Sequence, residues 1–128
     1  MTTLREGHRI AARAFGQRSE ARAAEWLEAQ GFTILARKFV IRGGEIDIIA
    51  QAGDTIAFVE VKARGSVEAA LGAITGGKQR RLARAAAAWI SRNPDAAEGC
   101  TLRGDALALD ANGPPLHIEN AFALDVED

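Results

Sequence analysis

The chain has 128 residues, of which 48% are hydrophobic and 26% charged, as is usual for one globular domain with its own core. No stretch approaches the roughly 18 consecutive apolar residues of a membrane span, and the N-terminus lacks the apolar segment of a secretory signal, so we expect a cytoplasmic protein without membrane contact. Cys100 is the single cysteine, which excludes an internal disulfide and a cysteine-based zinc site.

The net charge of −1 hides an uneven distribution along the chain. Residues 1–61 are balanced, residues 62–92 hold seven basic side chains against one acidic, and residues 93–128 hold one basic against eight acidic. A basic middle segment favours a localised anion-binding surface. On charge alone, a solvated helix face is the simpler interpretation.

The first half of the chain predicts a helix followed by three strands. Residues 10–30 are dense in helix formers and end at Gly31, while residues 1–10 are expected to be loose or to extend this helix. Three segments rich in β-branched and apolar residues predict strands, namely 32–41, 44–50 and 55–63.

The second half predicts one long helix and two strands. Residues 63–77 hold several glycines and are expected to be mostly loop with a short helix, whereas 78–92 form a clear helix closed by Asn93-Pro94. Strands are predicted at 102–110 and 115–122. The order α-β-β-β-α-β-β predicts a single α/β domain over residues 1–128, with a central mixed sheet flanked by helices.

The second and third predicted strands carry charges at alternate positions. Gly53-Asp54 between them fits a type II′ hairpin turn. In that register Asp47 lies opposite Glu60, and Glu45 lies opposite Lys62. Because side chains alternate along a strand, one face holds all four charges.

These charges predict a metal site. Directly opposed like charges destabilise a sheet, so Asp47 and Glu60 require a positive partner. A divalent cation, Mg or Mn, supplies one, since magnesium binds through one or two carboxylates and several waters. Lys62 would hold or deprotonate a water, or stabilise developing negative charge. The alternative is an exposed sheet face with salt bridges; we favour the site because Ile49 and Phe58 on the same face require burial.

The spacing of Asp47, Glu60 and Lys62 resembles the PD-(D/E)XK nuclease superfamily. The wider pattern is more specific: GEIDIIA and FVEVKAR, with an upstream helical glutamate in GQRSEARAAEWLEAQGF and a downstream GKQRRLARAA, resemble the YraN-like family of small bacterial proteins. The resemblance covers roughly residues 14–123. It implies a restriction-endonuclease-like fold and a metal-dependent, endonuclease-like protein acting on DNA or structured nucleic acid.

The resemblance also implies roles for helical residues. Glu20 takes the family's helical glutamate position, as an auxiliary catalytic acid or a metal ligand beside Asp47 and Glu60. Its place on a stripe with Ala23, Ala24 and Leu27 supports an inward direction, although such a glutamate is more often a structural salt-bridge partner. Basic and polar residues are expected to contact nucleic acid, namely Arg64, Lys78, Gln79, Arg80 and Arg81, with a solvated basic face as the alternative.

Two further observations concern packing. The family usually has an aromatic residue where Gly104 stands, so the packing of that strand is an open question. His117 has no partner at metal-ligand spacing and is interpreted as a packed strand residue, and Trp26 and Trp89 are interpreted as core or rim residues.

Three hypotheses follow, in order of preference. The first is a Mg- or Mn-dependent nuclease in which Asp47 and Glu60 are ligands, Lys62 handles the water or the charge, and Glu20 assists. The second is a non-catalytic nucleic-acid-binding module with the same fold, and the third a protein-interaction scaffold. Nucleases of this size commonly pair two copies, so by analogy a homodimer is also expected.

Overall fold

The structure is a computed structural model that describes residues 18–63, 66–110 and 113–124. The elements in chain order are an N-terminal helix at residues 18–29, followed by β1 (Thr33–Ile41), β2 (Gly44–Ala52), β3 (Thr55–Lys62), α2 (Val67–Gly72), α3 (Gly76–Arg92), α4 (Pro94–Ala97), β4 (Thr101–Ala108) and β5 (Leu116–Phe122). The predicted order of helices and strands is confirmed. The part of the first predicted helix before residue 18, and the segment 1–10, lie outside the described residues.

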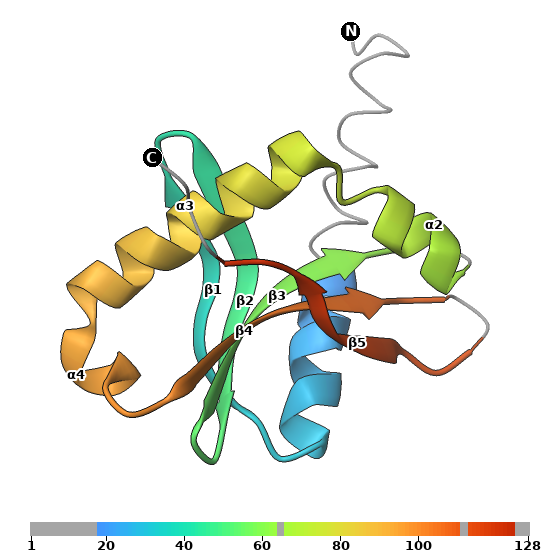
Figure 1. The fold of residues 1–128 in the computed structure, drawn as a ribbon. Helices are drawn as coiled ribbons and strands as arrows, with labels where there is room; N and C mark the ends of the chain where they lie inside the picture. Colours follow the sequence, from blue (N-terminus) through green and yellow to red (C-terminus); the bar gives the residue numbers. More distant parts are fainter. Residues whose placement is uncertain (1–17, 64–65, 111–112, 125–128) are drawn as a thin grey trace, which may run out of the picture.

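The strands form one five-stranded mixed sheet in the order β1-β2-β3-β4-β5 (Figure 1). The first three strands are antiparallel neighbours, β4 runs parallel to β3, and β5 is antiparallel to β4. A parallel neighbour requires a crossover connection, which α2, α3 and α4 provide between β3 and β4. The predicted α/β class with a mixed sheet is therefore confirmed. Within the described ranges, no helix is long and apolar enough to cross a membrane.

Two helices cover opposite faces of the sheet. The buried stripe of α3 consists of Leu82, Ala85, Ala86 and Trp89. Trp89 packs edge-on against Phe58 of β3, at 5.8 Å between ring centroids. On the other face, Ala23, Ala24 and Leu27 of the N-terminal helix pack on residues from β2, β3 and β4. Alternate residues of the central strands thus serve two separate cores.

The ends of the crossover helices follow local capping chemistry. The Thr75 hydroxyl accepts a hydrogen bond from the backbone N–H of Lys78 at 3.3 Å, so α3 starts two residues earlier than predicted. Ser66 caps α2 in the same way. The proline that ends α3 also begins α4, a short helix that the sequence prediction missed, because proline is well suited to a first helical turn.

The β1–β2 turn lies directly against α3. A Cβ atom added to Gly44 would stand 2.5 Å from the backbone oxygen of Arg81 and 3.2 Å from Cβ of Ala85. Only a residue without a side chain permits this approach. The start of β2 is therefore in backbone contact with the basic part of α3.

Gly104 of β4 lies directly against Phe122 of β5. A Cβ atom there would lie 2.5 Å from the backbone oxygen of Phe122 and 2.7 Å from its ring. The aromatic group that covers this part of β4 is thus supplied by the neighbouring strand β5. Gly104 and Phe122 are directly paired in the sheet register.

Candidate active site

A cleft of about 380 Å³ opens beside the ends of β2 and β3 and the first turns of α3. The residues that line it are Glu45, Asp47, Glu60, Val61, Lys62, Lys78, Arg81 and Leu82. All four charged residues of the predicted strand face are among them. The hairpin prediction brought them together correctly, and α3 adds two basic residues.

Asp47 lies where the pairing between β2 and β3 ends. The ladder follows the predicted register from Ala52↔Thr55 to Ile48↔Val59, and Gly53 has φ +57°, as a type II′ turn requires. The predicted pairing of Asp47 with Glu60 is not part of this ladder. Instead, Oδ2 of Asp47 accepts a hydrogen bond from the backbone N–H of Val61 at 2.8 Å. A side chain thereby satisfies a backbone amide of β3 that lies beyond the ladder, where the two strands are no longer paired.

Glu60 is the most heavily paired group of the cleft. Its carboxylate is 7% exposed, and its Oε1 atom accepts contacts from Nζ of Lys62 at 3.0 Å and from Nζ of Lys78 at 3.1 Å. Lys62 comes from the same strand and is buried, whereas Lys78 comes from α3 and its side chain is 37% exposed. One buried oxygen therefore carries two ammonium groups.

The pKa of Asp47 is unusual. Burial, followed by the Glu60 carboxylate, raises the pKa of Asp47 to about 7, although the hydrogen bond from Val61 acts in the opposite direction. Glu45 and Glu20 add smaller effects of the same sign as burial. Both lysines form their salt bridges with Glu60, whereas the hydrogen bond of Asp47 comes from a neutral backbone amide.

The two lysines are perturbed in opposite directions. Burial, and then a hydrogen bond with Lys78, lower the pKa of Lys62. Although burial opposes it, the hydrogen bond with Lys62 and the Glu60 carboxylate raise the pKa of Lys78. Of the two, Lys62 is therefore the one suited to exchange a proton, and Lys78 the one that keeps its positive charge.

Glu20 is buried, as predicted from its helical stripe, but its partners lie on β1. Its carboxylate is 3.2 Å from Nε of Arg37 and 3.9 Å from Nζ of Lys38. It is absent from the cleft lining and reaches Asp47 only as a field effect on the pKa. In the described part of the chain, no three His, Cys, Asp or Glu side chains form a group that could hold a metal ion.

The donor set nevertheless fits a hard cation in part. Asp47 and Glu60 offer carboxylate oxygens in a cleft open to solvent, which is the pattern magnesium accepts when waters complete its shell. Burial and the Glu60 carboxylate raise the pKa of Asp47, and a bound cation would favour the charged form of this carboxylate. Glu20, held by Arg37, does not complete a third ligand in this arrangement.

The predicted nucleic-acid contacts separate into groups. Lys78 and Arg81 line the cleft, and Arg80 is exposed nearby on α3. Gln79 has a structural contact, because its side-chain amide donates a hydrogen bond to the backbone oxygen of Ile74 at 3.2 Å. Arg64 lies outside the described residues.

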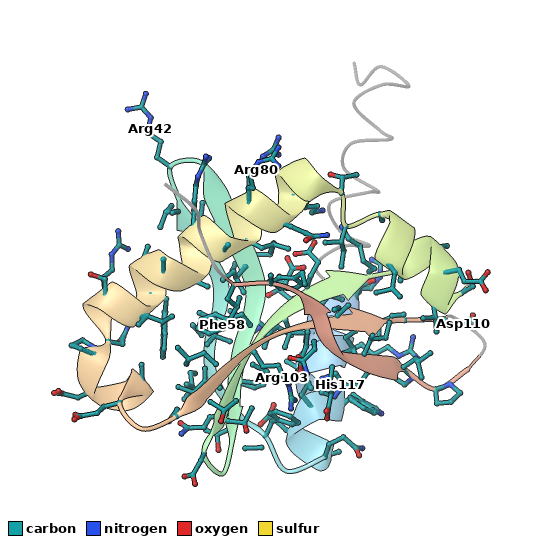
Figure 2. The ribbon with its side chains drawn as sticks, viewed as in Figure 1. Arg42, Phe58, Arg80, Arg103, Asp110 and His117 are labelled. Atoms are coloured by element: carbon teal, nitrogen blue, oxygen red, sulfur yellow. The ribbon has the colours of Figure 1, made fainter. Side chains whose placement is uncertain are left out.

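A buried ionic cluster that the sequence prediction missed lies elsewhere. Asp105 of β4 is fully buried; Arg103 donates to both its oxygens, Nε2 of His117 lies 2.7 Å from Oδ2, and the Asn120 N–H donates to Oδ1 (Figure 2). His117 also packs edge-on against Trp26, so it is a packed strand residue as predicted. Because Arg103 and Asp105 are two apart on a strand, alternation alone could have placed them on one face.

The fold and cleft define an α/β domain with a carboxylate pair and two lysines at the fork of a central hairpin. Over residues 19–109 the chain matches the model of "Uncharacterised protein family UPF0102", and it belongs to that family. This is the family to which the YraN-like resemblance pointed. A UPF0102 protein of Rhodopseudomonas palustris is 50% identical over 114 residues, covering 89% of this chain and 87% of its own. Relatives from Methylocella silvestris (48%; 86% of this chain, 88% of the relative) and Methylorubrum extorquens (47%; 86% and 85%) carry the same family name.

Proposed function

We propose that the protein is a metal-dependent nuclease that hydrolyses phosphodiesters of DNA or structured nucleic acid. The observation that carries this proposal is the cleft itself, where two carboxylates and a buried lysine of lowered pKa share a surface with basic residues of α3. A phosphodiester needs charge neutralisation and an activated water. The cleft holds groups for both tasks.

Each cleft residue has a role in this proposal. Asp47 and Glu60 would hold Mg²⁺ or Mn²⁺, which when bound would supply Lewis-acid stabilisation of the phosphate and a more acidic water. Lys62 takes up the proton of the attacking water when neutral, or stabilises negative charge when protonated. Lys78 and Arg81 bind phosphate oxygens at the cleft. Glu20 assists from outside through its effect on Asp47.

Surrounding charge supports nucleic acid as the substrate. Arg80, Arg81 and Arg84 are exposed on the first turns of α3, and Arg42 extends from the β1–β2 turn that packs on the same helix (Figure 2). These exposed arginines define the basic surface, and Arg81 is the member that lines the cleft. Arginines at such a surface bind a sugar–phosphate backbone without regard to sequence.

Cleavage of a labelled panel tests the proposal: single-stranded, duplex, flap and four-way-junction DNA, and RNA, each with Mg²⁺ and with Mn²⁺. We expect cleavage of at least one substrate, lowered about a hundredfold or more in Asp47→Asn and Lys62→Met. Glu98→Gln, at an exposed position beyond α4, is the matched control and keeps the wild-type rate. Activity that persists in both cleft variants would refute the proposal.

A non-catalytic nucleic-acid-binding module is the second candidate. It is favoured by one observation, that Glu60 is already paired with two ammonium groups. In that case all variants bind the panel with the same salt dependence, and none cuts it. The predicted homodimer is a separate proposal, which light scattering on the purified protein tests directly.

A further inference from the structure

The Lys78 ammonium group lies on the buried carboxylate of the cleft. Its Nζ atom lies 3.1 Å from Oε1 of Glu60, the same oxygen that Lys62 contacts at 3.0 Å. Both partners of Glu60 are therefore hydrogen-bonding cations, and the carboxylate is 7% exposed. A buried carboxylate needs one such partner to offset its desolvation, and here it has two.

The two lysines differ in their freedom to leave. The Lys62 side chain is 10% exposed and is fixed on the strand that carries Glu60. The Lys78 side chain is 37% exposed and rises from the first turn of α3. Lys78 is thus the partner that moves into solvent without a change of backbone.

The cleft has room for the exchange. Its volume of about 380 Å³ equals that of roughly a dozen water molecules. A partly hydrated ion therefore fits beside Asp47 and Glu60 once the Lys78 ammonium withdraws. Oε1 of Glu60 has two lone pairs, and the Lys62 and Lys78 ammonium groups already take both. An ion therefore binds that oxygen only in place of the Lys78 ammonium.

We infer that Lys78 is an internal substitute for the divalent cation, which keeps Glu60 neutralised in the metal-free protein and is released toward the phosphate when a cation binds. This inference rests on the proposed function and adds to it the order in which the cation and the nucleic acid bind. In the free protein Lys78 opposes metal binding. In the loaded protein the same ammonium group is available to the nucleic acid, so cation and nucleic acid bind with positive coupling.

Calorimetric titration with Mn²⁺ alone tests the first half without any reaction. We expect Lys78→Met to bind Mn²⁺ about tenfold more tightly than wild type, because the competitor is gone while Lys62 still pairs with Glu60. Arg80→Met is the matched control, since it removes one positive charge two residues away without contact to Glu60, and it changes the affinity by no more than about twofold. Circular dichroism confirms that both variants are folded.

The other outcomes are equally clear. Equal tightening in both variants assigns the effect to net charge and overturns the inference, as does weaker binding in Lys78→Met. If Asp47→Asn abolishes Mn²⁺ binding while Lys78→Met and wild type bind alike, the inference fails and the proposed metal site stands. If wild type and Lys78→Met both fail to bind Mn²⁺, both proposals fail.

Duplex affinity with Ca²⁺ or with chelator tests the second half. Wild type is expected to bind duplex DNA several-fold more tightly with Ca²⁺ than with chelator. Lys78→Met should lose this Ca²⁺ effect, whereas Arg18→Met, which removes an exposed positive charge from the N-terminal helix on the other face of the sheet, should keep it. An unchanged Ca²⁺ effect in Lys78→Met would overturn the coupling.

Discussion

Replacing Asp47 by asparagine is expected to stabilise the metal-free protein at neutral and alkaline pH. Burial and the neighbouring Glu60 raise the pKa of Asp47 from 3.8 to about 7. The native state therefore holds this proton more tightly than the unfolded chain does. Between about pH 4 and pH 7 the stability of wild type falls as the pH rises, and above pH 7 the full cost is present.

The magnitude follows from that shift. Each pKa unit corresponds to about 1.4 kcal/mol, so an isolated group would cost about 4 kcal/mol above pH 7. An asparagine side chain in place of Asp47 would avoid this cost. Its neutral oxygen would accept a weaker hydrogen bond from Val61, which lowers the gain in stability by about 1 kcal/mol. We expect Asp47→Asn to be more stable by about 2–3 kcal/mol at pH 8, and to have no advantage at pH 4.

Urea unfolding with chelator present, at pH 4, 6 and 8, measures the difference. Asp54→Asn at the exposed hairpin tip is the matched control, with no pH-dependent difference from wild type. Addition of Mg²⁺ at pH 8 should stabilise wild type more than Asp47→Asn and narrow the gap. A stability difference that does not change with pH, or a less stable Asp47→Asn at pH 8, would refute the reasoning.

Three further predictions concern packing, the buried ionic cluster and the basic surface. Gly104→Ala should lower the free energy of unfolding by about 1–3 kcal/mol, since its Cβ would meet Phe122 at 2.5 Å; Gly72→Ala, with open space around it, is the control in the same thermal melts, and an equal effect would contradict the packing account. Asp105→Asn should cost about 2–4 kcal/mol at pH 7, because the largely buried Arg103 guanidinium would keep only the exposed Glu119 carboxylate, at 3.4 Å, as a charged partner. Burial would raise the pKa of Asp105, but its hydrogen bonds with His117 and Arg103 lower this pKa below 3.8. The cost of Asp105→Asn should therefore shrink as the pH falls below about 4. A cost that stays constant in unfolding experiments at acid pH would contradict this account. Arg81→Ala should weaken nucleic-acid binding uniformly across sequences and reduce the salt slope by about one, and an unchanged slope would exclude a phosphate contact.

Periodicity made much of this fold predictable. The stripe of α3 and the alternation of β2 and β3 reflect burial on one face, which a sequence records directly. The hairpin register followed from Gly53, whose positive φ is a local requirement. Alternation and register together therefore suffice to place the four charged strand residues along one cleft.

The contacts within the site were less accessible to prediction. The bond between Asp47 and the Val61 amide depends on where the ladder stops, which is decided by tertiary twist and not by local pattern. The pairing of Lys78 with Glu60 depends on how closely α3 docks. Glu20 was correctly predicted to point inward. Its salt bridges with Arg37 and Lys38 of β1 could not be predicted, because no pattern in the sequence relates this strand to the helix.

The contact at Gly44 gives the cleft a fixed width. The strand that carries Asp47 begins against the backbone of Arg81, on the helix that carries Lys78. Because no side chain separates them, the strand and the helix are in direct backbone contact. A single methyl group added at Gly44 would move Asp47 away from Lys78 and Arg81. The absence of a Cβ atom at Gly44 thus sets the distance between the carboxylates of β2 and the basic residues of α3.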